Sequence, residues 1–117
     1  MGIEYGEPGP RDPDAYSETA HVQDSLEDPM RFVTRDLMRR AIREGRECPD
    51  EGEPGSYRRR LDVSGVDVVV VLSGHGNDII TTWTEVSDWA RALASDRWSQ
   101  DDLSTIRSFM DREHKRR

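Results

Sequence analysis

Cysteine, lysine and closely spaced histidines are scarce in this chain, and each shortage excludes a class of site. Cys48 is the single cysteine and Lys115 the single lysine among 117 residues. One cysteine excludes an intrachain disulfide and a thiolate metal cluster. The histidines stand at positions 21, 75 and 114, without the short spacing of paired metal ligands. The sequence therefore predicts no metal site.

Long apolar runs and nucleotide-binding motifs are also missing. No apolar run approaches the roughly 18 residues of a membrane-spanning helix. The first residues lack the basic region and apolar core of a signal peptide. No Walker loop and no dinucleotide-binding glycine pattern occurs. We therefore expect a soluble, cytoplasmic protein with no cofactor and no membrane partner.

Charge is abundant and mostly acidic. Charged residues make up 35% of the chain, apolar residues 33%, and the formal net charge is −7. Every basic residue except Lys115 is an arginine, a composition typical of a high-GC genome that favours a salt-loving, halophilic cytoplasm. Net acidity keeps a protein soluble and opposes indiscriminate nucleic-acid binding. Any phosphate site must therefore be a local cluster of arginines.

The clearest structural pattern lies between residues 57 and 84. Residues 66–72 are almost wholly β-branched, which favours a buried strand. The Ser64-Gly65 dipeptide and the polar run 73–78 are turn signals on either side. Residues 57–63 and 79–84 supply the flanking strands. We predict an antiparallel meander of three to four strands with 66–72 in its centre and helices on at least one face.

Two helices are predicted before this sheet. Residues 1–16 are rich in glycine, proline and acid, so we expect a flexible acidic leader. Ser17 or Thr19 caps a first short helix that ends before Pro29. Thr34 caps a second helix that stops at Gly45 and is followed by an acidic loop over 47–55. The predicted class is α+β, with a single domain over residues 17–117.

The last part, residues 85–117, is predicted to be a helical extension. Ser87 is the expected cap of one helix, and the run 99–102 has the form of a capping box that opens another. The final helix carries an apolar stripe, which we expect to pack onto the domain or to form a homodimer contact. The stripe consists of Leu103, Ile106, Phe109 and Met110.

Histidine, arginine and hydroxyl side chains together suit metal-independent RNA cleavage. In that reaction a base takes the proton of the ribose 2′-OH, which attacks the adjacent phosphate. Histidine suits proton transfer because its pKa lies near neutrality. Arginine suits charge stabilisation because its planar fork donates to two phosphate oxygens at once.

The order of short motifs resembles a known group of small domains. The motifs are Thr19-Ala20-His21, Arg31-Phe32-Val33-Thr34, the helical run 37–45, Tyr57-Arg58 and the strand 79–83. Over about residues 17–84 this order is similar to toxin-like domains of the RelE/barnase-like (BECR) ribonuclease superfamily, and most of all to its DUF4258 group. Ser25 departs from the pattern, because members often have a basic residue there, and residues 85–117 extend past the usual end.

The resemblance implies a set of site residues. His21 would transfer protons, Arg31 and Arg58 would hold the phosphate, and Thr82 would orient it. Further RNA contacts are expected from Arg35, Arg39, Arg60 and Thr81. Alternation along residues 57–63 puts Arg58 and Arg60 on one face of the strand, away from Leu61 and Val63. We expect that face to be the open one.

Two functional hypotheses follow. The first is a ribonuclease-like toxin, or a toxin-related RNA-binding domain, with RNA and an antitoxin as partners. The second is a catalytically inactive protein-interaction module on the same scaffold, such as an adaptor or a protein of a virus or mobile element. The acidic net charge speaks against the first, although high salt screens long-range attraction to phosphate in any case.

Overall fold

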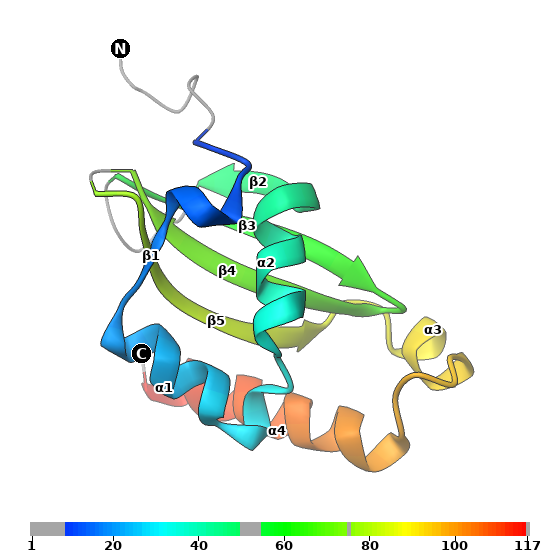
Figure 1. The fold of residues 1–117 in the computed structure, drawn as a ribbon. Coiled ribbons are helices and arrows are strands. Elements are labelled where there is room, and N and C mark those ends of the chain that lie inside the picture. Colours follow the sequence, from blue (N-terminus) through cyan, green and yellow to red (C-terminus); the bar gives the residue numbers. More distant parts are fainter. Residues whose placement is uncertain (1–8, 50–54, 75, 117) are drawn as a thin grey trace.

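The computed structural model describes residues 9–49, 55–74 and 76–116, and it confirms the α+β class. One sheet of five strands has the order β1-β5-β4-β3-β2. Its strands are β1 (Ser17–Glu18), β2 (Arg46–Pro49), β3 (Ser56–Val63), β4 (Val66–Ser73) and β5 (Asp78–Val86). The helix α2 lies across one face of the sheet, whereas α1 and α4 lie along the β5 side (Figure 1).

The predicted meander is confirmed. Strands β3, β4 and β5 pair antiparallel in sequence order, and β4 is the central strand. Every residue of β4 except Ser73 is buried, as its continuous β-branched run indicates. Ser64 and Gly65 form the β3–β4 hairpin with φ of 52° and 90°, the pair of positive values typical of a two-residue type I′ turn. A Cβ on Gly65 would lie 2.6 Å from the backbone of Asp88 and Ala92, so glycine is required there.

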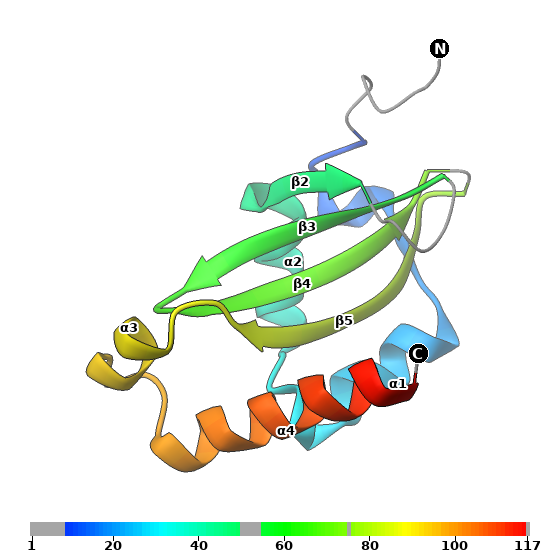
Figure 2. The ribbon, with the colours of Figure 1, turned by 180° about the vertical axis from the view of Figure 1, so that it is seen from behind.

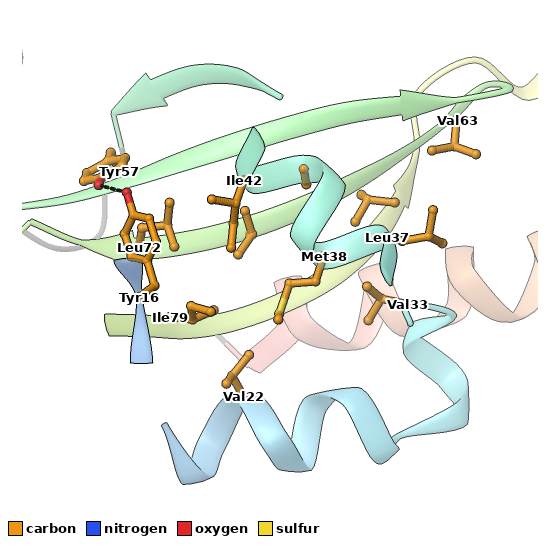
Figure 3. Close-up of a cluster of buried hydrophobic side chains, with 13 residues drawn as sticks. Tyr16, Val22, Val33, Leu37, Met38, Ile42, Tyr57, Val63, Leu72 and Ile79 are labelled. Carbon is orange, nitrogen blue, oxygen red and sulfur yellow. Dashed lines mark hydrogen bonds between the residues drawn. The ribbon is translucent and has the colours of Figure 1, made fainter. Parts of the chain in front are cut away.

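The helices before the sheet begin and end where their capping residues predict. Thr19 caps α1 (Ala20–Glu27), and its hydroxyl accepts a hydrogen bond from the amide of Val22. Thr34 caps α2 (Arg35–Glu44) in the same way, and Gly45 is its C-cap. Between them, the 3₁₀ turn η2 (Pro29–Arg31) redirects the chain. The buried side of α2 packs on β3 and β4 and forms the main core with α1 (Figure 3).

The sheet has more strands than the predicted three to four. The segment expected to be an acidic loop over 47–55 begins instead with β2, which pairs antiparallel with β3; residues 50–54 lie outside the described part. At the other edge, β1 pairs parallel with the start of β5. Both additions are short and polar, so they carry no hydrophobic pattern that would predict a strand.

The expectation of a flexible leader is wrong for residues 9–16, while residues 1–8 lie outside the described part. The 3₁₀ turn η1 (Pro13–Ala15) buries Pro13, and Tyr16 is buried beside Tyr57. The Tyr16 hydroxyl donates to the carbonyl of Pro10, and the two tyrosine oxygens lie 2.8 Å apart. Tyr57 therefore donates to Tyr16. Burial, followed by this hydrogen bond, raises the pKa of Tyr57.

Arg59 of β3 joins the N-terminal segment to the domain. Its side chain is 0% exposed, and all five of its N–H donors are used. They bond the Glu47 carboxylate at 2.9 and 3.0 Å and the carbonyl oxygens of Gly9, Pro10 and Ile42 at 2.7–2.9 Å. One guanidinium thus connects the N-terminal segment at Gly9 and Pro10 with the end of α2, β2 and β3.

The predicted C-terminal helices are confirmed. Asp88, one residue after the expected Ser87, caps α3 (Trp89–Ala94). Ser99 and Asp102 exchange the two hydrogen bonds of a capping box at the start of α4 (Gln100–Arg116). Leu103, Ile106 and Phe109 are buried against Val66 and the β5 side of the same chain. Of the two predicted uses of the stripe, packing onto the domain is the one that the structure shows.

Replacing Arg59 by Met should lower the free energy of unfolding by about 3–5 kcal/mol, the scale for breaking a buried ion pair. The substitution leaves Glu47 and three carbonyls without their donors. Arg43→Met, on the exposed side of α2, is the matched control and should change stability by less than about 0.5 kcal/mol. Urea unfolding followed by circular dichroism measures both, and equal effects of the two changes would contradict the role of Arg59.

Replacing Ile106 by Ala should destabilise the protein by about 2–5 kcal/mol, because Ile106 is 0% exposed and the change leaves a cavity. Leu93→Ala provides the control, since Leu93 is 44% exposed and its truncation should cost little. If thermal unfolding of Ile106→Ala matched that of the wild type, α4 would not be part of the core.

Candidate functional site

The strand register aligns three rows of side chains on the face of the sheet that points away from α2. They are Cys48, Arg58, Val71 and Thr81; then Arg46, Arg60, Val69 and Trp83; and then Asp62, Asp67 and Glu85. We call these residues the open face. Figure 2 shows this side of the sheet in front, with α2 behind and α4 below β5. No helix of the described part lies across β3 and β4 on this side.

Arg58 and Trp83 form the centre of the open face. The guanidinium carbon of Arg58 lies 5.2 Å from the centroid of the Trp83 ring, within cation–π range. Arg58 reaches Trp83 diagonally, because its direct partners across the rows are Val71 and then Thr81. Long side chains on this face cover Val69 and Val71, which are 0% and 5% exposed. The stacked pair therefore rests on a buried apolar floor.

Arg60 and two carboxylates form the acidic end of the open face. The Arg60 Nη1 lies 3.0 Å from Glu85 and 3.5 Å from Asp67, and the Trp83 indole donates to Glu85 at 2.7 Å. Burial is the largest single effect on Glu85 and favours its protonated form. The hydrogen bonds from Trp83 and Arg60 and the charges of Arg60 and Arg58 outweigh it, so the pKa of Glu85 lies below its ordinary value.

Arg31 lies at the outer side of β5, away from this centre. Its Nη1 donates to the Thr81 hydroxyl at 3.3 Å and to the Thr82 carbonyl at 3.1 Å. Its guanidinium stacks over Phe109 of α4 at 4.9 Å. Because β1 covers only the first residues of β5, Arg31 satisfies a carbonyl on the remaining edge. These contacts give Arg31 a structural role.

The four residues expected to act together in catalysis do not share one surface. Thr82 is 0% exposed, and its hydroxyl donates to the Val69 carbonyl. Its side chain alternates to the core face, opposite Arg58, so it is not placed to orient a phosphate there. His21 is exposed on α1, and its backbone carbonyl accepts a hydrogen bond from Ser25. Among the described residues, no hydrogen bond or ion pair joins the His21 imidazole to Arg31 or Thr82.

The residues expected to assist RNA binding are divided between the two sides of the sheet. Arg60 and Thr81 belong to the open face, although the Thr81 hydroxyl is engaged at the β5 edge by Ser25 and Arg31. Arg35 and Arg39 extend from α2 on the helical side, where each contacts a carboxylate of the N-terminal segment.

Trp83, Arg46 and Glu85 were not among the sequence-predicted residues. Period-two alternation alone gives the two faces of a single strand. Assigning Trp83 and Glu85 to the face of Arg58 requires the register between β3, β4 and β5. Assigning Arg46 to this face requires knowing that residues 46–49 form a strand that pairs with β3. The bulge between Val71 and Leu72 shifts that register by one residue, so counting back from the turn gives the wrong face for Trp83.

Comparisons with family models, curated proteins and solved structures find no match to this chain. Within the described residues, no helix is long and apolar enough to cross a membrane. The same residues contain no group of three or more histidine, cysteine or acidic side chains arranged to hold a metal ion. The open face thus offers guanidinium donors and an aromatic surface, with the Glu85 carboxylate held in an ion pair. That chemistry suits binding better than proton transfer.

The ion pair of Glu85 should give stability a measurable pH dependence. Its pKa is depressed in the folded state from about 4.5, so its contribution is present above pH 4.5 and is lost as pH falls through the folded pKa. The stability difference between wild type and Glu85→Gln should therefore shrink below about pH 4.5. Glu27→Gln, an exposed change of the same type on α1, is the control. A difference that stays constant with pH would show that Glu85 is not stabilised as the anion.

Proposed function

We propose that this chain is an RNA-binding domain on a ribonuclease-like scaffold, and that the open face holds single-stranded RNA. The observation that carries the proposal is the Arg58–Trp83 stack on a sheet face that no described helix covers. The motif order that resembles RelE/barnase-like domains supports the same ligand class.

Stacking is the first part of the recognition. Unpaired bases stack on aromatic rings and on the planar guanidinium of arginine, at about 1–3 kcal/mol per base. Arg58 presents such a plane above Trp83, and guanidinium N–H groups are donors that phosphate oxygens accept from. Every base has a π-face, so this contact tolerates different sequences.

The distribution of charge determines where single-stranded RNA would cross the open face. Arg46 is exposed on β2 and aligned with Arg60. Asp62, Asp67 and Glu85 form the opposite end of the face. Arg91 pairs with Asp62, and Arg60 pairs with Asp67 and Glu85, so three carboxylates face two arginines and the remaining negative charge repels phosphate. A bound RNA therefore runs over the β2–β3 side of the open face, past Arg46 and Arg58. Arg60, held by two carboxylates, keeps the acidic end neutral enough to allow this approach.

Binding without cleavage is the form of the function that the geometry favours. The buried Thr82 cannot contact a phosphate on the open face, and the Glu85 carboxylate is already paired. The proposal includes a cytoplasmic location and RNA as the principal partner. An antitoxin or other regulatory protein would act by covering the open face.

RNA affinity should depend on Arg58 and Trp83. Arg58→Ala and Trp83→Ala should each weaken binding of a labelled single strand of about 12 nucleotides by about 1–3 kcal/mol, the loss expected for one stacked base. Fluorescence anisotropy at low salt measures this. Arg107→Ala is the matched control, because Arg107 stacks over Trp89 at 5.0 Å on the helical extension. It removes the same charge and should change affinity little.

Two outcomes would contradict the proposal. Equal losses for Arg58→Ala and Arg107→Ala would reduce the effect to net charge. No binding by the wild type at low salt would favour the alternative, a protein-interaction module on the same scaffold. Gel analysis of the bound RNA with chelator present should show it intact, and cleavage that disappears in His21→Ala would replace binding by catalysis.

A further inference from the structure

The helix α2 carries a row of arginines on its solvent-exposed side. Arg35, Arg39 and Arg43 follow one another at intervals of four residues, which places them on one side of the helix, about 6 Å apart along its axis. Arg35 and Arg43 are exposed and Arg39 is partly exposed. We call these three residues the arginine row. It lies on the opposite side of the sheet from the open face (Figure 1).

The N-terminal segment occupies two members of this row. Glu18 accepts two hydrogen bonds from Arg35, at 2.7 and 2.9 Å, in a bidentate pair. Asp14 accepts one from Arg39 at 2.7 Å. The hydrogen bond from Arg35 is the main reason that the pKa of Glu18 is lowered. Arg43 pairs with no carboxylate of the described residues. We call residues 12–18 the acidic strap.

The strap region also explains much of the net charge. Residues 1–18 hold five acidic side chains and one basic side chain, so they contribute −4 of the chain's −7. Of these acidic residues, Glu18 and Asp14 lie against the arginine row. The carboxylate oxygens of this segment accept hydrogen bonds from the arginines, as the oxygens of a bound anionic ligand would.

We propose that the arginine row is a second phosphate-binding surface for single-stranded RNA and that the acidic strap is its intramolecular competitor. The inference rests on the proposed RNA-binding function and adds a regulated site to it. The bidentate fork that Arg35 gives to Glu18 is also the geometry in which arginine binds phosphate. Regular spacing along a straight helix matches successive phosphates of an extended strand, and this favours RNA over an acidic peptide.

The carboxylates of the acidic strap can separate from Arg35 and Arg39 while the backbone of the strap stays bound to the domain. Partly exposed ion pairs contribute little stability. Here Arg35 is 55% and Glu18 22% exposed in one pair, and Asp14 is 76% and Arg39 35% exposed in the other. The backbone of this part of the chain is held independently, before the strap by Arg59 at Gly9 and Pro10 and at the end of the strap by the pairing of Ser17 with Asp78. Competition therefore needs only the rotation of side chains, with the carboxylates kept close to the row.

The test compares two double variants of the full chain. Asp14→Asn with Glu18→Gln removes the competing charges. Asp24→Asn with Asp96→Asn makes the same change in net charge at exposed positions away from the row. Binding of the same labelled strand is measured over a series of salt concentrations. The strap variant should bind about three- to tenfold more tightly than the control variant. Its salt dependence should be steeper by about 1.4, or about 0.7 for each of two added phosphate contacts.

Further substitutions separate this inference from the function on which it rests. Adding Arg39→Ala and Arg43→Ala to the strap variant should abolish its gain, and an undiminished gain would overturn the inference. Equal affinities and salt slopes for the two double variants would also overturn it. The gain should persist in a Trp83→Ala background if the row binds independently of the open face. A gain in a protein whose wild-type binding ignores Trp83 would refute the open-face proposal and leave the arginine row standing.

Discussion

The buried guanidinium of Arg59 is the interaction on which the rest of the structure depends. An arginine removed from water is stable only if its charge and its donors are satisfied, and here one carboxylate and three carbonyls do so. Those acceptors come from β2, from the end of α2 and from the N-terminal segment at Gly9 and Pro10. Satisfying Arg59 therefore holds β2 against β3 and fixes the N-terminal segment beside α2. Both proposed surfaces, with Arg46 on one and the acidic strap on the other, depend on this arrangement.

Three consecutive arginines of β3 have different environments because a strand alternates its faces. Arg59 points to the helical side and is buried, while Arg58 and Arg60 point to the open face. Arg60 is neutralised by Glu85 and Asp67, and Arg58 stacks on Trp83. The three roles therefore do not follow from the residue type, which is arginine in each case. Its neighbours across the register decide whether an arginine is buried in the core, paired with carboxylates or stacked on an aromatic ring.

Features with local causes were predictable from the sequence, and features with distant causes were not. The β-branched run of β4, the Thr19 and Thr34 caps and the capping box at Ser99 each depend on a few adjacent residues, and the structure confirms them. The alternation that separates Arg58 from Arg59 is local too. Thr82, in contrast, was expected at the site but is buried, because its environment is set by pairing with β4. The ordered N-terminal segment depends on Arg59, about 50 residues away, and no local pattern of glycine, proline and acid shows it.

The central claim, that RNA lies on the open face, is tested most directly by the indole N–H signals of the three tryptophans. Trp83 lies on the open face, Trp89 stacks with Arg107, and Trp98 donates to the Val63 carbonyl on the helical side. In an NMR titration with a short single-stranded RNA, the Trp83 signal should shift progressively while those of Trp89 and Trp98 stay in place. Shifts confined to Trp89 and Trp98, or no shift of Trp83 at saturating RNA, would contradict it.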